Sequence, residues 1–287
     1  MDDERSASAV EIKFDTIGYW SELKLDIIRE YAAAYSRILN AQPSLHHSYI
    51  DAFAGSGLHI SKATGEFVRG SPANAMLVSP SFREYHFIDL DHAKLTGLEA
   101  LAQTRPNVHV YAGDCNQVLI EDVFPQVRYE DYRRALCVLD PYGLHLDWKV
   151  IATAGRMKSV EIFLNFPVAD INRNVLWNDR TSVSPLHVKR MDMFWGDDSW
   201  AQEAYRKSKQ NDMFGSPAEE KASNDEIAEA FRRRLRSVAG FKKVPKPIAM
   251  RNSQNAIVYY LYFASQNPTA EHIVQQIFEK YGNRRGE

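Results

Sequence analysis

The chain has 287 residues, a formal net charge of -2 and only two cysteines, with 45% hydrophobic residues. This length can bury a large core as one domain or as one domain with an insertion. The near-neutral charge excludes a general attraction to nucleic acid, so that any basic surface must be local. Two cysteines are too few for a disulfide framework or a metal cluster, and we expect reduced, buried thiols and no metal site.

The N-terminal part of the chain is polar and has no membrane signal. No apolar run reaches the roughly 18 residues of a membrane span, and the first residues are not signal-like. We therefore expect a cytoplasmic protein that does not contact a membrane. After a lead-in at residues 1–20, apolar residues at three-to-four spacing predict a helix from Ser21, its N-cap, to about Leu39. Lys24 and Arg29 on this helix are interpreted as solvated surface charges.

The segment Tyr49–Gly57 reads Y-I-D-A-F-A-G-S-G and predicts a strand that ends in a tight turn at Asp51. Glycine adopts positive φ and has no Cβ, so Gly55 and Gly57 would let the backbone approach a ligand closely. An ordinary tight turn explains the same letters. A small loop or hairpin closed by Gly65 should follow, and then a helix with Ser71 as N-cap and Pro72 at its first position.

Acidic residues follow four successive strand candidates. The strands are residues 49–50, 85–88, 108–112 and 135–139, and the carboxylates after them are Asp51, Asp89 with Asp91, Asp114 and Asp140. Helical patterns between the strands predict a mostly parallel, doubly wound sheet. Ligands of such sheets bind at the carboxyl ends of the strands, where these carboxylates would converge.

The second half of the chain changes character after a fifth strand at residues 160–166. Residues 168–224 are rich in tryptophan and charge and predict a helical insertion, a candidate substrate lid. Helices at 224–238 and 269–281 and strands at 246–250 and 257–264 would complete the sheet with an antiparallel pair at its edge. The expected division is therefore a cofactor-binding core at 21–167, the insertion at 168–224 and the completion of the core sheet at 225–287.

The motifs D-x-F-A-G-x-G, G-S-P, F-I-D-x-D, G-D-x-N, L-D-P-Y-G-L and N-F-P, spread over residues 24–167, resemble the three-Cys-motif partner protein family. That family looks like class I S-adenosylmethionine-dependent methyltransferases. The resemblance implies an α/β, Rossmann-like fold with a seven-stranded, mostly parallel sheet and a helical insertion after strand five. It also implies S-adenosylmethionine as the cofactor and a three-Cys-motif protein as a partner.

The resemblance further implies which residues contact the cofactor. Asp89 would accept hydrogen bonds from the ribose hydroxyls, and Asp114 would face the adenine amino group, since carboxylates match these donors. The implied cofactor-binding residues are Asp51, Phe53, Ala54, Gly55, Gly57, Asp89, Leu90, Asp91, Asp114 and Cys115. The sulfonium itself needs no metal.

The segment Asp140-Pro141-Tyr142 resembles the D-P-P-Y motif of amino-group methyltransferases, with one proline missing. In those enzymes the acidic side chain and a proline carbonyl accept the hydrogens of the target amine, and the aromatic ring stacks on the base. These residues are therefore the catalytic candidates, although a strand end closed by an Asp-Pro turn explains them equally well. A cytosine-5 methyltransferase is excluded, because Cys137 lies inside its strand and Asp140-Pro141 takes the position of the nucleophile.

Two functions follow from these motifs. The first is N-methylation of an amino group, with a nucleic-acid base as the candidate acceptor, bound by a local basic face from Arg232 to Arg251 and by aromatic residues of the insertion. A charge run on a helix is, however, often only a solvated face. The second is a non-catalytic, cofactor-binding partner module. A dehydrogenase is disfavoured, because the loop lacks G-x-G-x-x-G spacing.

Overall fold

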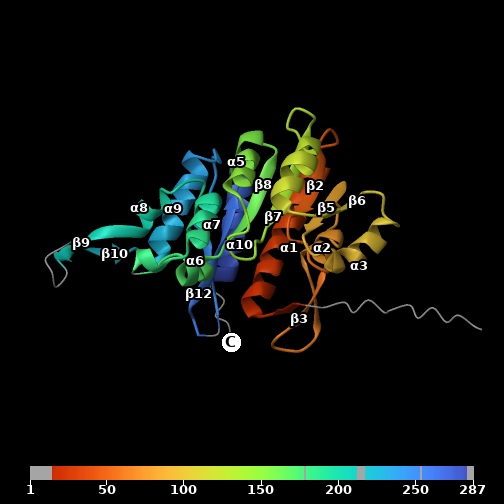
Figure 1. The fold of residues 1–287 in the computed structure, drawn as a ribbon. Helices are drawn as coiled ribbons and strands as arrows, with labels where there is room; N and C mark the ends of the chain where they lie inside the picture. Colours follow the sequence, from red (N-terminus) through yellow and green to blue (C-terminus); the bar gives the residue numbers. More distant parts are fainter. Residues whose placement is uncertain (1–14, 178, 212–216, 253, 283–287) are drawn as a thin grey trace, which may run out of the picture.

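The computed structural model describes residues 15–177, 179–211, 217–252 and 254–282, and a seven-stranded sheet forms its centre (Figure 1). The strand order is β11-β12-β8-β7-β2-β5-β6. Five strands run parallel: β2 (His46–Asp51), β5 (Glu84–Asp89), β6 (Val108–Ala112), β7 (Arg133–Leu139) and β8 (Val160–Phe166). β12 (Ile257–Ala264) is antiparallel to β8, and β11 (Ile248–Arg251) is antiparallel to β12. The predicted mostly parallel sheet with an antiparallel edge pair is confirmed.

The order of the strands reverses between β2 and β7. The chain runs outward from β2 to β5 and β6, and then returns to β7 on the other side of β2. In the register, Asp51 pairs with Val138 of β7 and with Phe87 of β5. Asp140, two residues after Val138, therefore leaves the sheet beside Asp51. This is the switch point at which open α/β sheets bind ligands.

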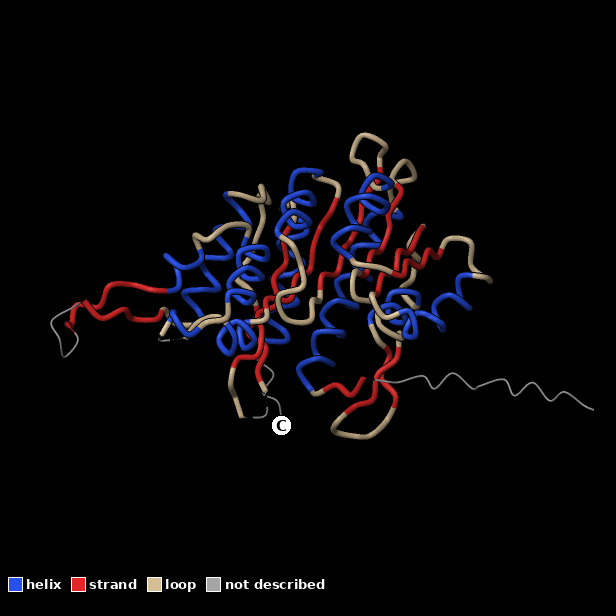
Figure 2. The backbone as a smooth tube through the Cα atoms, viewed as in Figure 1, coloured by secondary structure: helices blue, strands red, loops and turns tan. Residues whose placement is uncertain are grey.

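Helices cover both faces of the sheet (Figure 2). One face carries α1 (Tyr19–Asn40), α2 (Ser71–Met76), α3 (His92–Ala102) and α10 (Pro268–Gly282). The other face carries α4 (Cys115–Val118), α5 (Trp148–Met157), α6 (Val168–Asn174), α7 (Pro185–Trp195), α8 (Trp200–Ala204) and α9 (Asn224–Ser237). After α4 the chain continues through a π-helical turn and a 3-10 turn to Gln126. Because side chains alternate along a strand, Leu136 and Val138 face α1, whereas Cys137 and Leu139 face α5.

A small second sheet lies beside the turn after β2. β1 (Asp15–Ile17) runs parallel to β3 (Leu58–Ser61), which pairs antiparallel with β4 (Phe67–Arg69). The expected hairpin is therefore present, and Gly65 has a φ of 73° in its turn. This sheet brings the start of the described chain next to the glycine loop.

The insertion contains α6, α7, α8 and a 3-10 turn at Arg180–Ser182, and also a hairpin that the sequence pattern did not predict. Its strands are β9 (Tyr205–Asn211) and β10 (Pro217–Lys221), which pair antiparallel. Figure 1 shows the hairpin extending away from the body. Its sequences are polar and charged, which is untypical of strands.

No described helix is long and apolar enough to cross a bilayer.

Two predicted helix caps are wrong. Gly18, not Ser21, is the N-cap of α1, and the Ser21 N–H donates to the Gly18 carbonyl at 2.9 Å from within the first turn. Gly70, not Ser71, is the N-cap of α2. Ser71 is the first helical residue, because its hydroxyl hydrogen-bonds the Tyr49 hydroxyl of β2 instead of the helix N-terminus.

The packing of α5 predicts that Gly155→Ala destabilises the fold. An added Cβ would lie 2.0 Å from the Ala239 carbonyl oxygen and 3.2 Å from the Phe241 ring. Backbone cannot give way as a flexible side chain can, so we expect the free energy of unfolding to fall by about 2 kcal/mol or more in urea denaturation. Gly97→Ala on the exposed side of α3, whose Cβ meets nothing within 4 Å, should be neutral or stabilising. Equal effects of the two changes would contradict this packing.

Candidate active site

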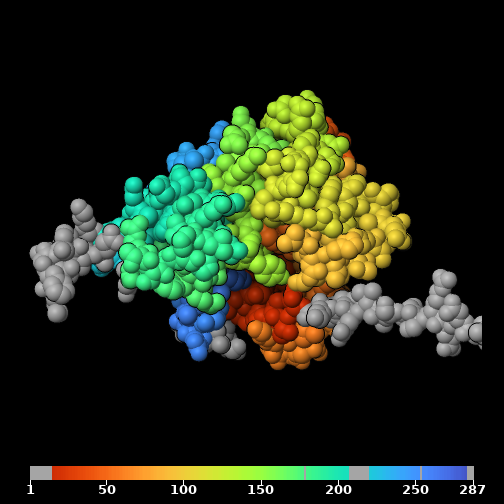
Figure 3. Space-filling model, viewed as in Figure 1, coloured from red at the N-terminus to blue at the C-terminus, as the bar shows by residue number. Residues whose placement is uncertain are grey.

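Four acidic side chains lie at the carboxyl ends of neighbouring strands. Asp51 ends β2, Asp89 ends β5, and Asp114 and Asp140 follow β6 and β7. Asp51 and Asp89 are buried, Asp140 is half-buried and Asp114 is exposed. The space-filling view shows the insertion, in green, on one side of this face and the yellow segment around α3 on the other, with red and orange residues between them (Figure 3).

The glycine loop after β2 is tied to the end of β5. The Gly55 N–H donates to Asp89 Oδ2 at 2.8 Å, and the Ala54 N–H donates to the Ile88 carbonyl at 2.9 Å. Gly55 and Gly57 have φ angles of 61° and 76°, a conformation that favours glycine. A Cβ on Gly55 would meet no atom within 4 Å, so the loop presents bare backbone on an open side.

The residues at the end of β5 divide between ligand-facing and structural roles. Asp89 Oδ1 accepts from the Asp91 N–H at 2.9 Å and Oδ2 accepts from Gly55, so each oxygen keeps a lone pair for a further donor. The Leu90 side chain is 78% exposed. Asp91 caps α3 by accepting from the Ala93 N–H at 3.0 Å. Of the three, Asp89 and Leu90 have groups that the protein leaves accessible or with spare lone pairs, whereas Asp91 uses one oxygen as a helix cap.

The end of β6 carries one exposed carboxylate and one buried thiol. Asp114 Oδ1 accepts from the Asn116 N–H at 2.9 Å and from its Nδ2 at 3.0 Å. Cys115 is buried in the core below α4, and burial raises the pKa of its thiol to about 12. Burial also raises the pKa of Cys137 within β7. Both cysteines are therefore protonated, inert thiols, and any contact of Cys115 with a ligand would use its backbone.

Asp140 is held by two side chains that the sequence analysis did not assign to the site. Lys24 Nζ of α1 donates to Asp140 Oδ2, and Asn165 Nδ2 of β8 donates to Oδ1 at 2.8 Å. The Lys24 side chain is 10% exposed and that of Asp140 is 33% exposed. The interpretation of Lys24 as a solvated charge is therefore wrong, whereas Arg29 is exposed and pairs with Asp26.

The burial of Lys24 follows from its position on α1. Lys24 lies on the same helical face as Ile27, Ile28 and Tyr31, which pack on the sheet. Burial favours the neutral amine, but the Asp140 carboxylate outweighs it and raises the pKa of Lys24, which stays charged. A charge in an apolar stripe requires a buried partner. The position of Lys24 in the apolar face of the helix is visible in the sequence, but the sequence does not identify Asp140 as its partner.

Asp51 lies next to this pair and has an unpaired oxygen. Its Oδ1 accepts from the Phe53 N–H at 3.2 Å, and its buried Oδ2 has no hydrogen-bond partner. Burial raises the pKa of Asp51 to about 7, against the lowering effects of the Ser71 hydroxyl, the Phe53 N–H and Lys24. A buried polar atom without a partner is costly and indicates a position where a ligand or solvent donor belongs.

Tyr142 stands at the edge of the site and is 63% exposed, whereas Pro141 before it is buried. Its hydroxyl donates to Asp15 Oδ2 of β1 at 3.4 Å, and Lys94 Nζ of α3 lies 5.5 Å from its ring centroid. On the other side of the ring, a cavity of about 230 Å³ separates it from the insertion. The cavity is lined by Tyr142, Gly143, Leu144, His145, Asp170, Asn174, His187 and Arg190.

Comparisons with known proteins agree with this architecture. No family model and no curated protein matches the chain. Among solved structures, a Legionella pneumophila protein, LPL1258, is 13% identical with a TM-score of 0.52, covering 89% of this chain and 90% of its own. A Thermobifida fusca protein provisionally named a methyltransferase is 15% identical with a TM-score of 0.41, covering 84% and 80%. An S-adenosylmethionine-dependent methyltransferase from Clostridium acetobutylicum is 10% identical with a TM-score of 0.38, covering 82% and 90%.

The chain has the Rossmann-like fold of class I methyltransferases. The strand order, with antiparallel β12 inserted between β8 and β11, and the likeness to the Legionella structure over nine-tenths of both chains carry this assignment. Identities this low concern the fold alone. The resemblance to the three-Cys-motif partner family therefore stays a prediction.

The buried ion pair predicts that Lys24→Met destabilises the protein. Removing the ammonium leaves Asp140 with Asn165 as its one remaining side-chain donor, among the described residues. Breaking a fully buried pair costs about 3–5 kcal/mol, and because Asp140 is partly exposed we expect about 1–3 kcal/mol in urea denaturation. The control Lys94→Met breaks the Asp15 pair, whose carboxylate is more exposed, and should cost under about 1 kcal/mol. A loss for Lys24→Met as small as the control's would contradict the assignment.

The raised pKa of Asp51 predicts that the stability of the protein depends on pH. Its pKa is about 7 in the folded chain and about 4 when unfolded, so its stabilising contribution is present below pH 4 and is lost as the pH rises through 7. Asp51→Asn removes this loss. A pKa of about 7 against about 4 corresponds to about 4 kcal/mol, so we expect the variant to gain on the wild type by roughly 3–4 kcal/mol in the free energy of unfolding between about pH 4 and pH 8. Asp26→Asn, at a partly exposed position, is the control for the substitution itself, and a difference for Asp51→Asn that does not change with pH would refute the raised pKa of Asp51.

Proposed function

We propose that this protein is an S-adenosylmethionine-dependent methyltransferase that methylates an amino nitrogen, with the exocyclic amine of a nucleic-acid base as its acceptor. One observation carries the proposal: the carboxylate of Asp140, fixed by Lys24 and Asn165, lies at the switch point of the sheet beside the glycine loop. Pro141 and the exposed ring of Tyr142 follow it directly.

The residues at the strand ends fit the proposed cofactor. Asp51 has an unpaired buried oxygen, Asp89 keeps lone pairs for the ribose hydroxyls, and the exposed Leu90 offers an apolar surface to the adenine ring. The bare backbone at Gly55 leaves room for the methionine part. When bound, S-adenosylmethionine supplies an activated methyl group on a sulfonium.

Asp140 has the capacity to accept a further hydrogen bond. A carboxylate offers about four lone-pair sites, and Lys24 and Asn165 occupy two of them. The remaining sites can accept an N–H of the target amine, which raises the electron density on nitrogen and orients its lone pair. The Lys24 ammonium and the Asn165 amide hold the Asp140 carboxylate in one position, so Lys24 and Asn165 act as positioning residues. The proton released after transfer can leave through Asp140 to solvent, since its side chain is partly exposed.

The surroundings of Tyr142 support a flat acceptor. Its ring borders the 230 Å³ cavity, whose lining includes His145 from the turn after Tyr142, and Asp170, His187 and Arg190 from the insertion. An aromatic ring beside cationic and hydrogen-bonding groups suits the stacking of a base next to a phosphate backbone. In the insertion, the exposed Trp177 can stack a base, whereas Trp195 and Trp200 are buried in the core.

Three arginines of the basic face from Arg232 to Arg251 are engaged in contacts within the protein. Arg232 binds the Val244 carbonyl and Glu229, Arg233 pairs with Glu203, and Arg234 pairs with Asp197 and lies over the rings of Trp148 and Trp195. These arginines therefore stabilise α9 on the insertion. Contacts of this face with nucleic acid, like a three-Cys-motif partner, remain predictions.

Replacement of Asp140 tests the proposal. With labelled S-adenosylmethionine and total RNA or genomic DNA as acceptors, we expect wild-type transfer to amino nitrogens and a loss of about 100-fold or more in Asp140→Ala. Cofactor affinity, measured by calorimetry, should change by less than about 3-fold, because Asp140 contacts the acceptor. Asp140→Asn keeps an acceptor for Lys24 and controls for misfolding, and Asp131→Ala at an exposed site should be fully active.

The same assay separates the two candidate functions. Cofactor binding without transfer to any acceptor, with and without a three-Cys-motif protein, would favour the non-catalytic partner module. Absence of cofactor binding would refute both. Unchanged transfer in Asp140→Ala would show that this carboxylate does not act on the amine.

A further inference from the structure

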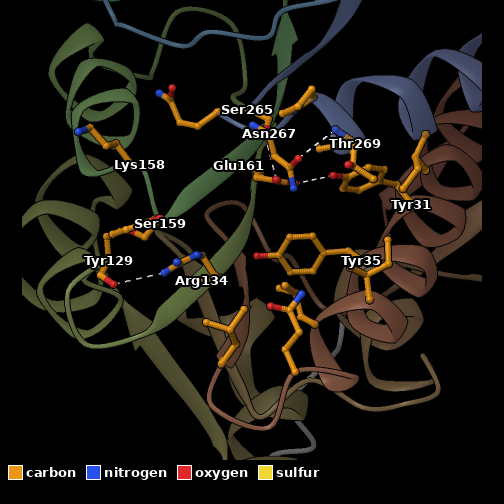
Figure 4. A pocket seen from close by; sticks show the side chains of 18 residues that line it. Tyr31, Tyr35, Tyr129, Arg134, Lys158, Ser159, Glu161, Ser265, Asn267 and Thr269 are labelled. Carbon is orange, nitrogen blue, oxygen red and sulfur yellow. Dashed lines mark hydrogen bonds between the residues drawn. The ribbon is translucent and has the colours of Figure 1, made fainter.

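A second cavity lies at the opposite edge of the sheet from Asp140. It measures about 510 Å³ and lies where β7 and β8 begin, between α1 and α10. Figure 4 shows its lining side chains converging from these elements. The volume lies within the range of about 300–1,000 Å³ typical of small-molecule sites. None of the residues assigned to the candidate active site lines it.

One part of the cavity wall is aromatic and apolar, and the rest is polar. Tyr31 and Tyr35 of α1 form one side, Tyr129 forms part of the other, and Ile38 and Ile273 lie at the helix rims. Tyr31 packs edge-on against Phe163 of the sheet at a centroid distance of 5.4 Å, which fixes the floor. Such walls suit a flat ring.

Two buried hydroxyl groups in this cavity have no hydrogen-bond partner. Tyr35 is 7% exposed and Ser159 is 1% exposed, and neither Tyr35 Oη nor Ser159 Oγ is hydrogen-bonded in the structure. Buried polar groups are almost always paired, and leaving one unpaired costs about 1–3 kcal/mol. In Figure 4 the Tyr35 hydroxyl points across the cavity toward Arg134. Both hydroxyls lack a partner but have almost no accessible surface, so the Tyr35 hydroxyl would reach a ligand after a small rotation of its side chain.

The charges at the cavity favour an anion. Arg134 lies over the Tyr129 ring at 3.8 Å and uses Nη1 on the carbonyls of Tyr129 and Arg133, which leaves the rest of its guanidinium for a ligand. Lys158 is exposed at the rim. Both oxygens of the acidic residue, Glu161, already accept from the hydroxyls of Tyr31 and Ser265. Burial raises the pKa of Glu161 to about 7, so it carries only part of a charge near neutral pH.

We propose that this cavity binds a small aromatic anion, a flat ring that carries a carboxylate or phosphate group. The ring packs between Tyr35 and the side chains of Ile38 and Ile273. The anionic group receives hydrogen bonds from Arg134 and the Tyr35 hydroxyl. A guanidinium is suited to bidentate contacts with both kinds of anion. The site is separate from the proposed methyl-transfer chemistry and does not depend on it.

Calorimetric titration of the full chain tests the proposal. The probes are 4-hydroxybenzoate, as the carboxylate source, and phenyl phosphate, as the phosphate source, since neither carries the adenosyl group of the proposed cofactor. We expect saturable, one-to-one binding of one of them, and binding at least about 10-fold weaker for its uncharged counterpart, 4-hydroxybenzamide or phenol. No binding of either anion at millimolar concentration would overturn the proposal.

Variants place the binding in this cavity. Arg134→Met should weaken binding about 10-fold or more, and Tyr35→Phe, which removes one hydroxyl, about 3-fold to 10-fold. Arg128→Met, at an exposed position nearby, is the matched control and should leave the affinity unchanged. Equal affinities of wild type, Arg134→Met and Tyr35→Phe, all shown to be folded by circular dichroism, would overturn the site.

A pH series adds an independent readout. Glu161 accepts hydrogen bonds from Tyr31 of α1 and Ser265 after β12, and Tyr35, Tyr129, Arg134 and Lys158 are the other titratable or charged residues that line the cavity. Because its pKa is about 7, its charge grows as the pH rises through 7 and repels the anion, so wild-type affinity should fall. Glu161→Gln keeps the shape and should remove this fall. Identical pH profiles for the two proteins would contradict binding beside Glu161.

Discussion

The candidate site depends on one buried ion pair, between Lys24 of α1 and Asp140 after β7. It joins a helix that precedes the sheet in the chain to the strand end at the switch point. An unpaired charge at either position would be costly, so the pair fixes both elements relative to each other. Asn165 of β8 completes the contact from the neighbouring strand. The catalytic candidate is therefore held from two sides before any ligand arrives.

α1 and β8 contribute side chains to polar sites at both ends of the sheet. Along β8, Glu161, Phe163 and Asn165 point to the α1 face because side chains alternate. Asn165 reaches Asp140 at the carboxyl end, and Glu161 reaches Tyr31 at the amino end. Between them lies an aromatic floor, in which Tyr31, Phe163 and Phe263 are in contact. Two polar sites thus sit at opposite ends of one apolar contact between α1 and the sheet.

The insertion and the small sheet frame the acceptor side. β1 and α3 reach Tyr142 through Asp15 and Lys94, and α7 faces it across the smaller cavity. Arg233 and Arg234 of α9 pair with Glu203 and Asp197 of the insertion and so help to hold it in place. Binding of nucleic acid by the basic face from Arg232 to Arg251 stays a prediction.

The sequence by itself determined the sheet, its parallel core and edge pair, and the strand ends at Asp51, Asp89, Asp114 and Asp140, because apolar runs and glycine turns are local signals. It also contained the lysine within the apolar face of α1. Only the tertiary structure decided which carboxylate pairs with that lysine, that Cys115 is buried in the core and that Arg233 and Arg234 of α9 pair with the insertion. Lys24 and Asp140 lie 116 residues apart, and the two arginines pair with carboxylates 30 and 37 residues away, so spacing along the chain does not encode these contacts.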